Sequence, residues 1–207
     1  MLQEINKEIL ISLNSLTSYD FIQTFILCLA DTPIFFLPIF LLCSWIYYTY
    51  KKSPVIISDI HFTKNLLEKE KLLYIFYSVL IGISISLLIQ QIIQVDRPEE
   101  AIKGVGLLLL DHIPNASFPS DHATVAIAFL TSLFLAGYKK IGFFYLPFVI
   151  FMLLSRIILG VHWPFDIFAG TIVGVFSSFI TFKYLNKIAF IEKLNKFIID
   201  IMGYLKL

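Results

Sequence analysis

Long apolar runs are the feature that most constrains what this 207-residue chain can fold into. The core of a bilayer is about 30 Å thick, and a helix of roughly 20 mostly apolar residues crosses it. Backbone polar groups inside lipid must be hydrogen-bonded within the protein, so such runs fold as helices. Five runs of this kind occur, at residues 33–50, 72–93, 122–138, 141–161 and 164–184.

The segments outside these runs are shorter or amphipathic. Residues 19–30 form an apolar stretch that ends at Asp31 and Pro33, which we interpret as a re-entrant or interfacial helix, with a sixth span as the alternative. Residues 1–16 and 188–207 mix apolar with charged side chains, a pattern typical of helices that lie along a membrane surface. The sequence therefore predicts an all-α, polytopic transmembrane helix bundle of five or six spans. We expect interfacial helices at both termini and a single domain over residues 1–207.

Composition agrees with this class and excludes others. Hydrophobic residues make up 58% of the chain and charged residues 15%, whereas soluble domains average about 45–50% and about 25%. The net charge of +1 provides no field for an acidic partner, which argues against a nucleic-acid binder. Cys28 and Cys43 both lie in apolar runs, so neither a disulfide framework nor a zinc site is indicated.

The basic residues are distributed unevenly between the two ends of the predicted spans. Lysines follow the first and fifth spans and lie between the third and fourth, while Arg97, Lys103 and Arg156 are the cations of the opposite side and Lys7 is ambiguous. Cytoplasmic loops of membrane proteins carry the excess of lysine and arginine. We therefore expect the lysine-rich side to face the cytoplasm and the two arginines to face outward.

Four polar segments should meet on that outer side. Polar residues near membrane depth are costly and usually functional. Either arginine alone is explained equally well by interfacial snorkelling, but antiparallel spans would bring all four segments to one face. These segments are Asp96-Arg97-Pro98, Phe118-Pro119-Ser120-Asp121-His122, Ser155-Arg156 and the stretch from Gly160 to Asp166.

The residue types at these segments indicate a phosphate site. Ser120 is a natural N-cap, and Pro164 is suited to the first turn of another helix. Helix N-termini favour anions, and guanidinium groups bind phosphate through paired hydrogen bonds. Two helix starts together with Arg97 and Arg156 would suit a doubly charged tetrahedral group better than a carboxylate.

Two histidines add the elements of phosphoryl transfer. Asp166 follows His162 by four residues, one helical turn, and so can accept from one ring nitrogen and leave the other free to attack. His122 would face them and give a proton to the departing oxygen. A lone histidine at an interface is more often an anchor, but a pair beside two arginines favours catalysis.

These residues resemble the type 2 phosphatidic acid phosphatase superfamily. Its third signature is complete as Ser155-Arg156, His162 and Asp166, its second is present as Pro119-Ser120-Asp121-His122, and its first retains Arg97-Pro98. The motifs and their spans cover residues 74–184. The resemblance implies that His162 is the nucleophile and forms a phosphohistidine, that Asp166 orients it, and that His122 is the general acid. It also implies a clamp, free of metal and cofactor, made by Arg97, Ser120, Arg156 and the Asp121 backbone N–H.

Two positions depart from the family pattern. The family lysine falls at Gln90, which donates hydrogen bonds without charge and which we assign to the phosphate contacts, with Lys103 as a possible replacement for the lysine. The family glycine is Asp121, whose carboxylate would repel a phosphate unless it points away. With glutamine and aspartate at these two positions, the sequence resembles the bacterial bacitracin-resistance type of undecaprenyl-diphosphate phosphatase.

That resemblance implies a substrate and a location. The expected reaction removes the terminal phosphate of undecaprenyl diphosphate, in the bacterial cytoplasmic membrane, with the active site facing the periplasmic or outer side. Alternatives are another lipid phosphate (phosphatidylglycerol phosphate, phosphatidic acid or lipid A), a phosphotransferase, or a non-enzymatic membrane protein with a degenerate site. The sequence does not indicate an oligomeric state.

Overall fold

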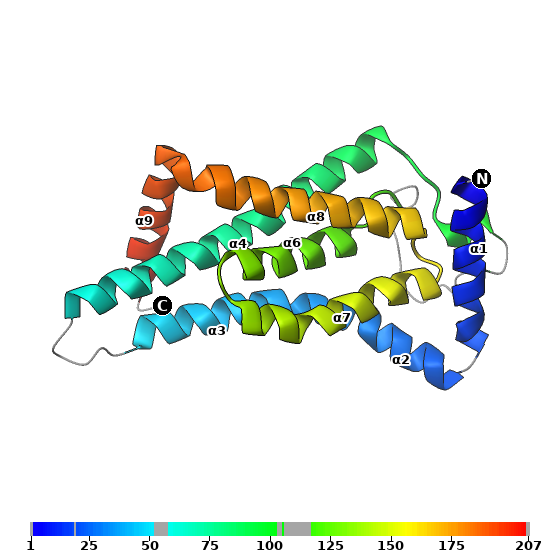
Figure 1. The fold of residues 1–207 in the computed structure, drawn as a ribbon, viewed down its shortest axis with the longest axis horizontal. Coiled ribbons are helices and arrows are strands. Elements are labelled where there is room, and N and C mark those ends of the chain that lie inside the picture. The colour runs from blue at the N-terminus through cyan, green and yellow to red at the C-terminus, as the bar shows by residue number, and fades with distance from the viewer. Residues whose placement is uncertain (1, 19, 52–57, 103–104, 106–116, 206–207) are drawn as a thin grey trace.

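Long helices that run side by side form the body of the molecule (Figure 1). The computed structural model describes residues 2–18, 20–51, 58–102, 105 and 117–205. The lengthwise helices are α2 (Asp20–Asp31), α3 (Phe36–Tyr50), α4 (Ser58–Ile92), α6 (Asp121–Leu135), α7 (Lys139–Ile158) and α8 (Pro164–Tyr184).

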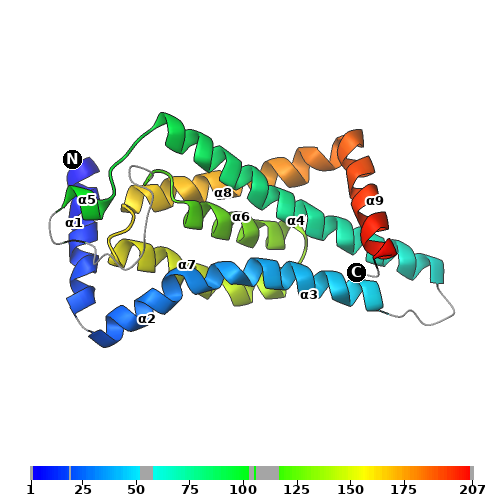
Figure 2. The same cartoon turned by 180° about the vertical axis from the view of Figure 1, so that it is seen from behind.

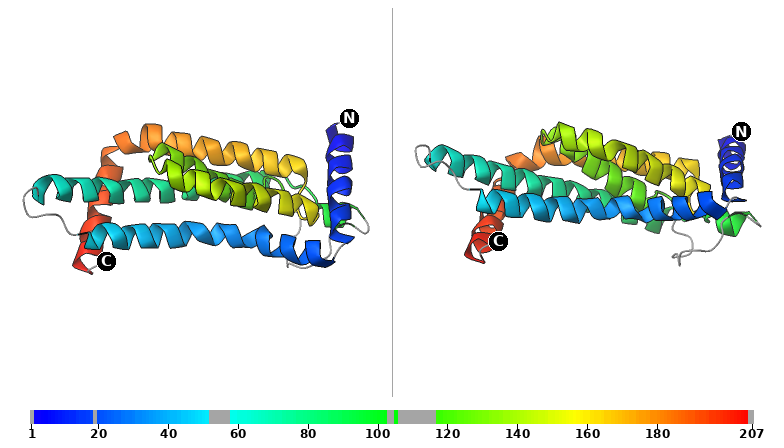
Figure 3. Two further views of the ribbon diagram at one scale, coloured as in Figure 1. Left: turned by 60° about the horizontal axis from the view of Figure 1, so that its bottom comes forward. Right: turned by 90° about the horizontal axis from the view of Figure 1, so that it is seen from below.

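Short or terminal helices cross the two ends of this bundle. α1 (Leu2–Asn14) lies across one end, near the short helix α5 (Pro98–Ala101), and α9 (Ala189–Tyr204) lies across the other (Figures 1 and 3). Asn14 Nδ2 donates to the Ile158 carbonyl at 2.8 Å and fixes α1 to the end of α7. Tyr77 Oη donates to Asn195 Oδ1 at 2.9 Å and fixes α9 to α4. The predicted all-α helix bundle is confirmed, and the terminal segments expected to be interfacial form helices that lie across its two ends.

Four helical stretches are long and apolar enough to cross a membrane: Gln23–Tyr50, Lys64–Ile92, Lys139–Ile158 and Pro164–Lys187. The first joins α2 to α3 through a 3-10 turn at Thr32–Phe35, with Pro33 at its start, where the missing N–H costs little. Residues 19–30, as far as the structure describes them, thus belong to one long helical stretch. The described part of this segment therefore continues directly into α3 and is not separated from it by a loop.

Helix α6 is the central element. Its 15 residues rise about 22 Å, which is less than the thickness of a bilayer core. It packs against α4, α7 and α8, and most of its side chains are buried. The helix can be short because its neighbours surround it. Its N-terminus therefore lies inside the bundle.

Helix α8 approaches α6 very closely. A Cβ added at Gly170 would lie 2.5 Å from the Ser120 carbonyl oxygen, and one at Gly174 would lie 2.7 Å from the Thr124 carbonyl oxygen. Small residues spaced four apart are a common way to bring two membrane helices together. Ser178 Oγ adds a hydrogen bond to the Ala128 carbonyl at 2.8 Å. This contact positions the N-termini of α6 and α8 side by side.

Candidate active site

The four polar segments meet at the end of the bundle that α1 crosses (Figure 2). Arg97 Nη1 donates to the Val161 carbonyl at 3.0 Å, which joins the segment after α4 to the turn before α8. The Ser120 N–H donates to the Asp166 carbonyl at 3.1 Å, which joins the starts of α6 and α8. The predicted convergence is therefore present in the structure.

Ser120 begins α6 in the predicted way. Its backbone is extended, and its side-chain oxygen accepts from the Ala123 N–H at 3.5 Å. Ser120 is fully buried. The N–H groups of Asp121 and His122 belong to the first turn of the helix, where no carbonyl of the helix itself can accept from them.

A tight turn after α7 carries His162 to the site. Gly160 adopts a φ of +71°, a conformation that glycine reaches without strain. The Arg156 carbonyl then accepts from the Val161 N–H at 3.1 Å and from the His162 N–H at 3.3 Å. The turn holds His162 two residues before Pro164, which opens α8.

The geometry determines which nitrogen of His162 carries the proton. Nδ1 lies 3.0 Å from the Ser117 carbonyl oxygen. Since a carbonyl only accepts, Nδ1 is the protonated nitrogen and Nε2 keeps its lone pair. This is the tautomer that a nucleophilic histidine requires.

Asp166 acts on His162 less directly than the sequence predicted. Its Oδ2 lies 3.6 Å from His162 Nδ1, beyond an ordinary hydrogen bond. The same oxygen accepts from Ser117 Oγ at 2.5 Å and from the Trp163 N–H at 2.9 Å. Asp166 therefore fixes Ser117, and the Ser117 carbonyl holds the imidazole. Ser117 was not among the predicted site residues.

The surroundings of His162 keep it neutral. The residue is 3% exposed. Burial and the nearby charges of Arg156 and Arg97 lower the pKa of His162 well below its ordinary value of 6.5. A neutral imidazole with a free lone pair can attack phosphorus at neutral pH.

Arg156 and His122 are linked by the carboxylate of Asp31, which was not among the predicted site residues. Asp31 Oδ1 lies 2.8 Å from Arg156 Nη1 and 3.0 Å from His122 Nε2. Arg156 is 2% exposed, and its Nε is buried without a hydrogen-bond partner among the described residues. One signal was available: Asp31 ends an apolar helix, where the helix dipole disfavours a negative charge.

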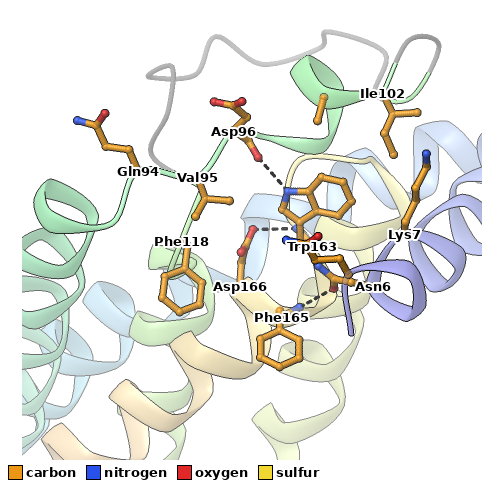
Figure 4. A pocket seen from close by; sticks show the side chains of 12 residues that line it. Asn6, Lys7, Gln94, Val95, Asp96, Ile102, Phe118, Trp163, Phe165 and Asp166 are labelled. Atoms are coloured by element: carbon orange, nitrogen blue, oxygen red, sulfur yellow. Dashed lines mark hydrogen bonds between the residues drawn. The ribbon is translucent and has the colours of Figure 1, made fainter. Parts of the chain in front are cut away.

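A cavity of about 620 Å³ opens beside the site (Figure 4). Asp166 and Trp163 form its inner side, and Trp163 Nε1 donates to the Asp96 carbonyl at 2.9 Å. Gln3, Asn6 and Lys7 of helix α1 also line the cavity, and Asn6 Oδ1 accepts from the Phe165 N–H at 3.1 Å. Figure 4 shows Lys7 and Asn6 on α1 facing Trp163.

Two further observations bear on ligands. No group of three His, Cys, Asp or Glu side chains is placed to hold a metal ion within the part of the chain that the structure describes. The proposed replacement for the family lysine, Lys103, lies outside the described residues.

A family model described as the PAP2 superfamily matches residues 71–189, more than half of the chain. The chain belongs to the PAP2 superfamily. The matched region holds His122, Arg156, His162 and Asp166, whereas Asp31 and α1 precede it.

Curated relatives match a shorter part of this PAP2 chain. It is 39% identical over 88 residues to the "Bacitracin transport permease protein BcrC" of Bacillus licheniformis. It is also 39% identical over 79 residues to the "Undecaprenyl-diphosphatase BcrC" of Bacillus subtilis, and 36% over 81 residues to the "Putative undecaprenyl-diphosphatase YbjG" of Escherichia coli. The matches cover 42%, 37% and 39% of this chain and 42%, 39% and 39% of those relatives. The chain thus matches about two fifths of each relative's length.

A solved structure shares the fold of this chain. The crystal structure of Aquifex aeolicus LpxE superimposes with a TM-score of 0.52 over 71% of this chain and 87% of that chain. The sequence identity is 22%, so the likeness concerns the fold alone.

The two departures from the PAP2 pattern contact each other. Gln90 Nε2 donates to Asp121 Oδ1 at 2.8 Å and to the Pro119 carbonyl at 3.0 Å, and Ser86 Oγ donates to the same Asp121 oxygen at 2.6 Å. Both N–H groups of the Gln90 amide are thus used inside the protein. The assignment of Gln90 to the phosphate contacts stays a prediction. In the structure, Gln90 and Ser86 hold the Asp121 carboxylate toward α4.

Proposed function

We propose that this chain is an integral membrane phosphatase that removes the terminal phosphate of undecaprenyl diphosphate through a phosphohistidine. The observation that carries the proposal is the neutral His162, whose Nε2 lone pair is free, close to the charges of Arg97 and Arg156. Two relatives whose names contain undecaprenyl-diphosphatase support this choice of lipid.

The proposed reaction has two steps. In the first, His162 Nε2 attacks the terminal phosphorus, the bond to the bridging oxygen breaks, and His122 gives that oxygen a proton, which releases undecaprenyl phosphate. In the second, His122 takes a proton from water as the water oxygen attacks the phosphohistidine, which releases inorganic phosphate. Arg97, Arg156 and the N–H groups at the start of α6 stabilise the charge on the phosphoryl oxygens.

Two cavities suit the two parts of such a lipid. The 620 Å³ cavity next to Asp166 presents Lys7, Asn6 and Gln94 to a polar head group. A second cavity, of about 400 Å³, lies among α2, α3 and α7 and begins at Thr32 and Pro33, directly after Asp31. Its other lining residues are Cys28, Leu29, Phe35, Phe36, Ile39, Phe144, Tyr145 and Phe148, which suits a polyprenyl tail.

We also propose that the protein resides in the bacterial cytoplasmic membrane with this site facing outward. The described lysines at the ends of α3, α4, α7 and α8 lie at the end of the bundle opposite His162. The excess of positive charge belongs on the cytoplasmic side.

The test is phosphate release from undecaprenyl diphosphate by the purified protein. We expect His162→Ala and Arg156→Ala to abolish phosphate release. Both variants should still be folded, with an unfolding temperature close to that of the parent protein. A ³²P label on the terminal phosphate should be trapped on the parent protein and be absent from His162→Gln. Undiminished turnover by either alanine variant would refute the mechanism.

A panel of lipids addresses the alternatives for the substrate. We would measure turnover of phosphatidic acid, phosphatidylglycerol phosphate and lipid A, each with and without an acceptor lipid. The rates on the different lipids identify the substrate, and a dependence on the acceptor identifies phosphotransfer. Faster turnover of one of these lipids would replace undecaprenyl diphosphate in the proposal and leave the roles of the residues intact.

A further inference from the structure

Asp31 occupies a position that a substrate oxygen should take. Its Oδ1 is within hydrogen-bond distance of both Arg156 Nη1 and His122 Nε2, at 2.8 Å and 3.0 Å. Under the proposed function, one group holds the phosphoryl oxygens and the other protonates the leaving oxygen. A carboxylate oxygen and a phosphate oxygen cannot occupy the same place, and their charges repel each other.

The carboxylate satisfies the guanidinium incompletely. It contacts Nη1 of Arg156, whereas Nε stays buried without a hydrogen-bond partner among the described residues. Buried donors are almost always paired in folded proteins. A tetrahedral phosphate has enough oxygens to accept from Nε and Nη together, in the paired geometry that guanidinium groups prefer. Phosphate therefore fits this group better than Asp31 does.

The backbone at Asp31 is fixed, but its side chain has room to move. Ala30 and Ile26 are buried against Leu159 and Val161, which anchors the end of α2 on the turn that carries His162. The Asp31 side chain is 36% exposed, whereas that of Arg156 is 2% exposed. A rotation about the side-chain bonds of Asp31 can clear the site without a shift of the helix.

We propose that Asp31 is a built-in competitor for the phosphoryl group: its carboxylate occupies the anion position on Arg156 and His122, and bound phosphate displaces it. The proposal deepens the proposed function and rests on it for the identity of the substrate. It makes α2, which precedes the family-matched region, part of the active site. Weakly charged anions would then fail to enter, because they gain too little from Arg156 to displace the carboxylate.

Direct binding of inorganic phosphate tests the proposal without turnover. We would measure the dissociation constant by calorimetry on the full chain in detergent. We expect Asp31→Asn and Asp31→Ala to lower the Kd by about tenfold, because phosphate no longer has to break a charge-assisted hydrogen bond. Asp31→Glu keeps the charge and should keep a Kd close to that of the parent protein.

Glu99→Gln is the matched control for charge alone. The charge of Glu99 interacts with those of Arg97 and Arg156, yet Glu99 has no hydrogen bond to Arg156 or His122 among the contacts described. Its removal should strengthen phosphate binding less than threefold. Equal effects of Asp31→Asn and Glu99→Gln, or no phosphate binding by any of these proteins, would overturn the proposal.

Turnover separates this inference from the proposed function. If phosphate binding tightens in Asp31→Asn while no lipid phosphate is hydrolysed by any protein, the competitor role stands and the proposed reaction fails. If lipid turnover is normal and Asp31→Asn binds phosphate no more tightly, the competitor role alone fails. If the competitor role of Asp31 and the proposed reaction are both correct, Asp31→Asn should lower the KM for the lipid.

Discussion

At the turn that carries His162, burial and two guanidiniums act on the imidazole in the same direction. The folded state holds the pKa of His162 well below 6.5, whereas the unfolded chain has the ordinary value. Between the folded pKa and about 6.5, the unfolded state therefore binds a proton that the folded state does not. The contribution of neutral His162 to the free energy of unfolding is fully present above about pH 6.5. It decreases as the pH drops toward the pKa of His162 in the folded state.

We expect the free energy of unfolding of the parent protein to fall more steeply below pH 6.5 than that of His162→Asn, by up to about 1.4 kcal/mol per pH unit. Thermal unfolding in detergent at a series of pH values measures the difference. For the same reason, protonation of His162 should not limit activity until the pH is well below 6.5. Parallel stability curves for the two proteins would contradict a neutral, buried His162.

A second residue-scale prediction concerns Gln90 and Asp121. Because the Gln90 amide binds the Asp121 carboxylate, the two side chains should act as one unit. We expect the effects of Gln90→Ala and Asp121→Asn on stability to be non-additive by about 1 kcal/mol. Unfolding of the two single variants and the double variant measures this coupling. If Gln90 instead bound phosphate independently, Gln90→Ala would raise the KM equally with Asp and with Asn at position 121.

At the scale of elements, the α6–α8 contact positions both helix starts of the site. A methyl group at Gly174 would meet the Thr124 carbonyl oxygen and the Ala128 nitrogen, which are backbone atoms that cannot rotate away. We expect Gly174→Ala to destabilise the protein by about 1–3 kcal/mol, the usual cost of overpacking. Thermal unfolding in detergent is the measurement.

Gly203→Ala in α9 is the matched control for this substitution. A Cβ at Gly203 has nothing within 4 Å, and alanine favours helix. Gly203→Ala should therefore leave stability unchanged or raise it slightly. A Gly174→Ala protein as stable as Gly203→Ala would show that the helices can separate without cost.

At the scale of the whole molecule, the crosswise helices α1 and α9 lie at opposite ends of the bundle, so they should report opposite sides of the membrane (Figure 1). In a Cys28→Ser/Cys43→Ser background, we expect Glu8→Cys to react with a membrane-impermeant maleimide in intact cells. Lys193→Cys should react only after permeabilisation. The reverse labelling pattern would place the site on the cytoplasmic side.

The local pattern of the chain predicted the helices and most of the residues that the structure brings together at the candidate site. Apolar length predicts lipid-spanning helices because backbone groups in lipid have no other partner, and α8 matches its predicted range, residues 164–184. Ser120 as an N-cap and the spacing from His162 to Asp166 are equally local features, so they were readable. The sequence also predicted Arg97, Arg156 and His122 at one end, because consecutive helices that run antiparallel bring these segments back to the same end of the bundle.

Contacts between distant segments were decided by the tertiary structure alone. Asp31 reaches Arg156 and His122 across the bundle, the Ser117 carbonyl replaces Asp166 as the acceptor of the His162 proton, and Gln90 binds Asp121. The physical reason is that sequence periodicity fixes which face a side chain occupies but not which neighbouring helix supplies its partner. That choice depends on how closely the helices pack, and here α8 can approach α6 only because Gly170 and Gly174 lack side chains.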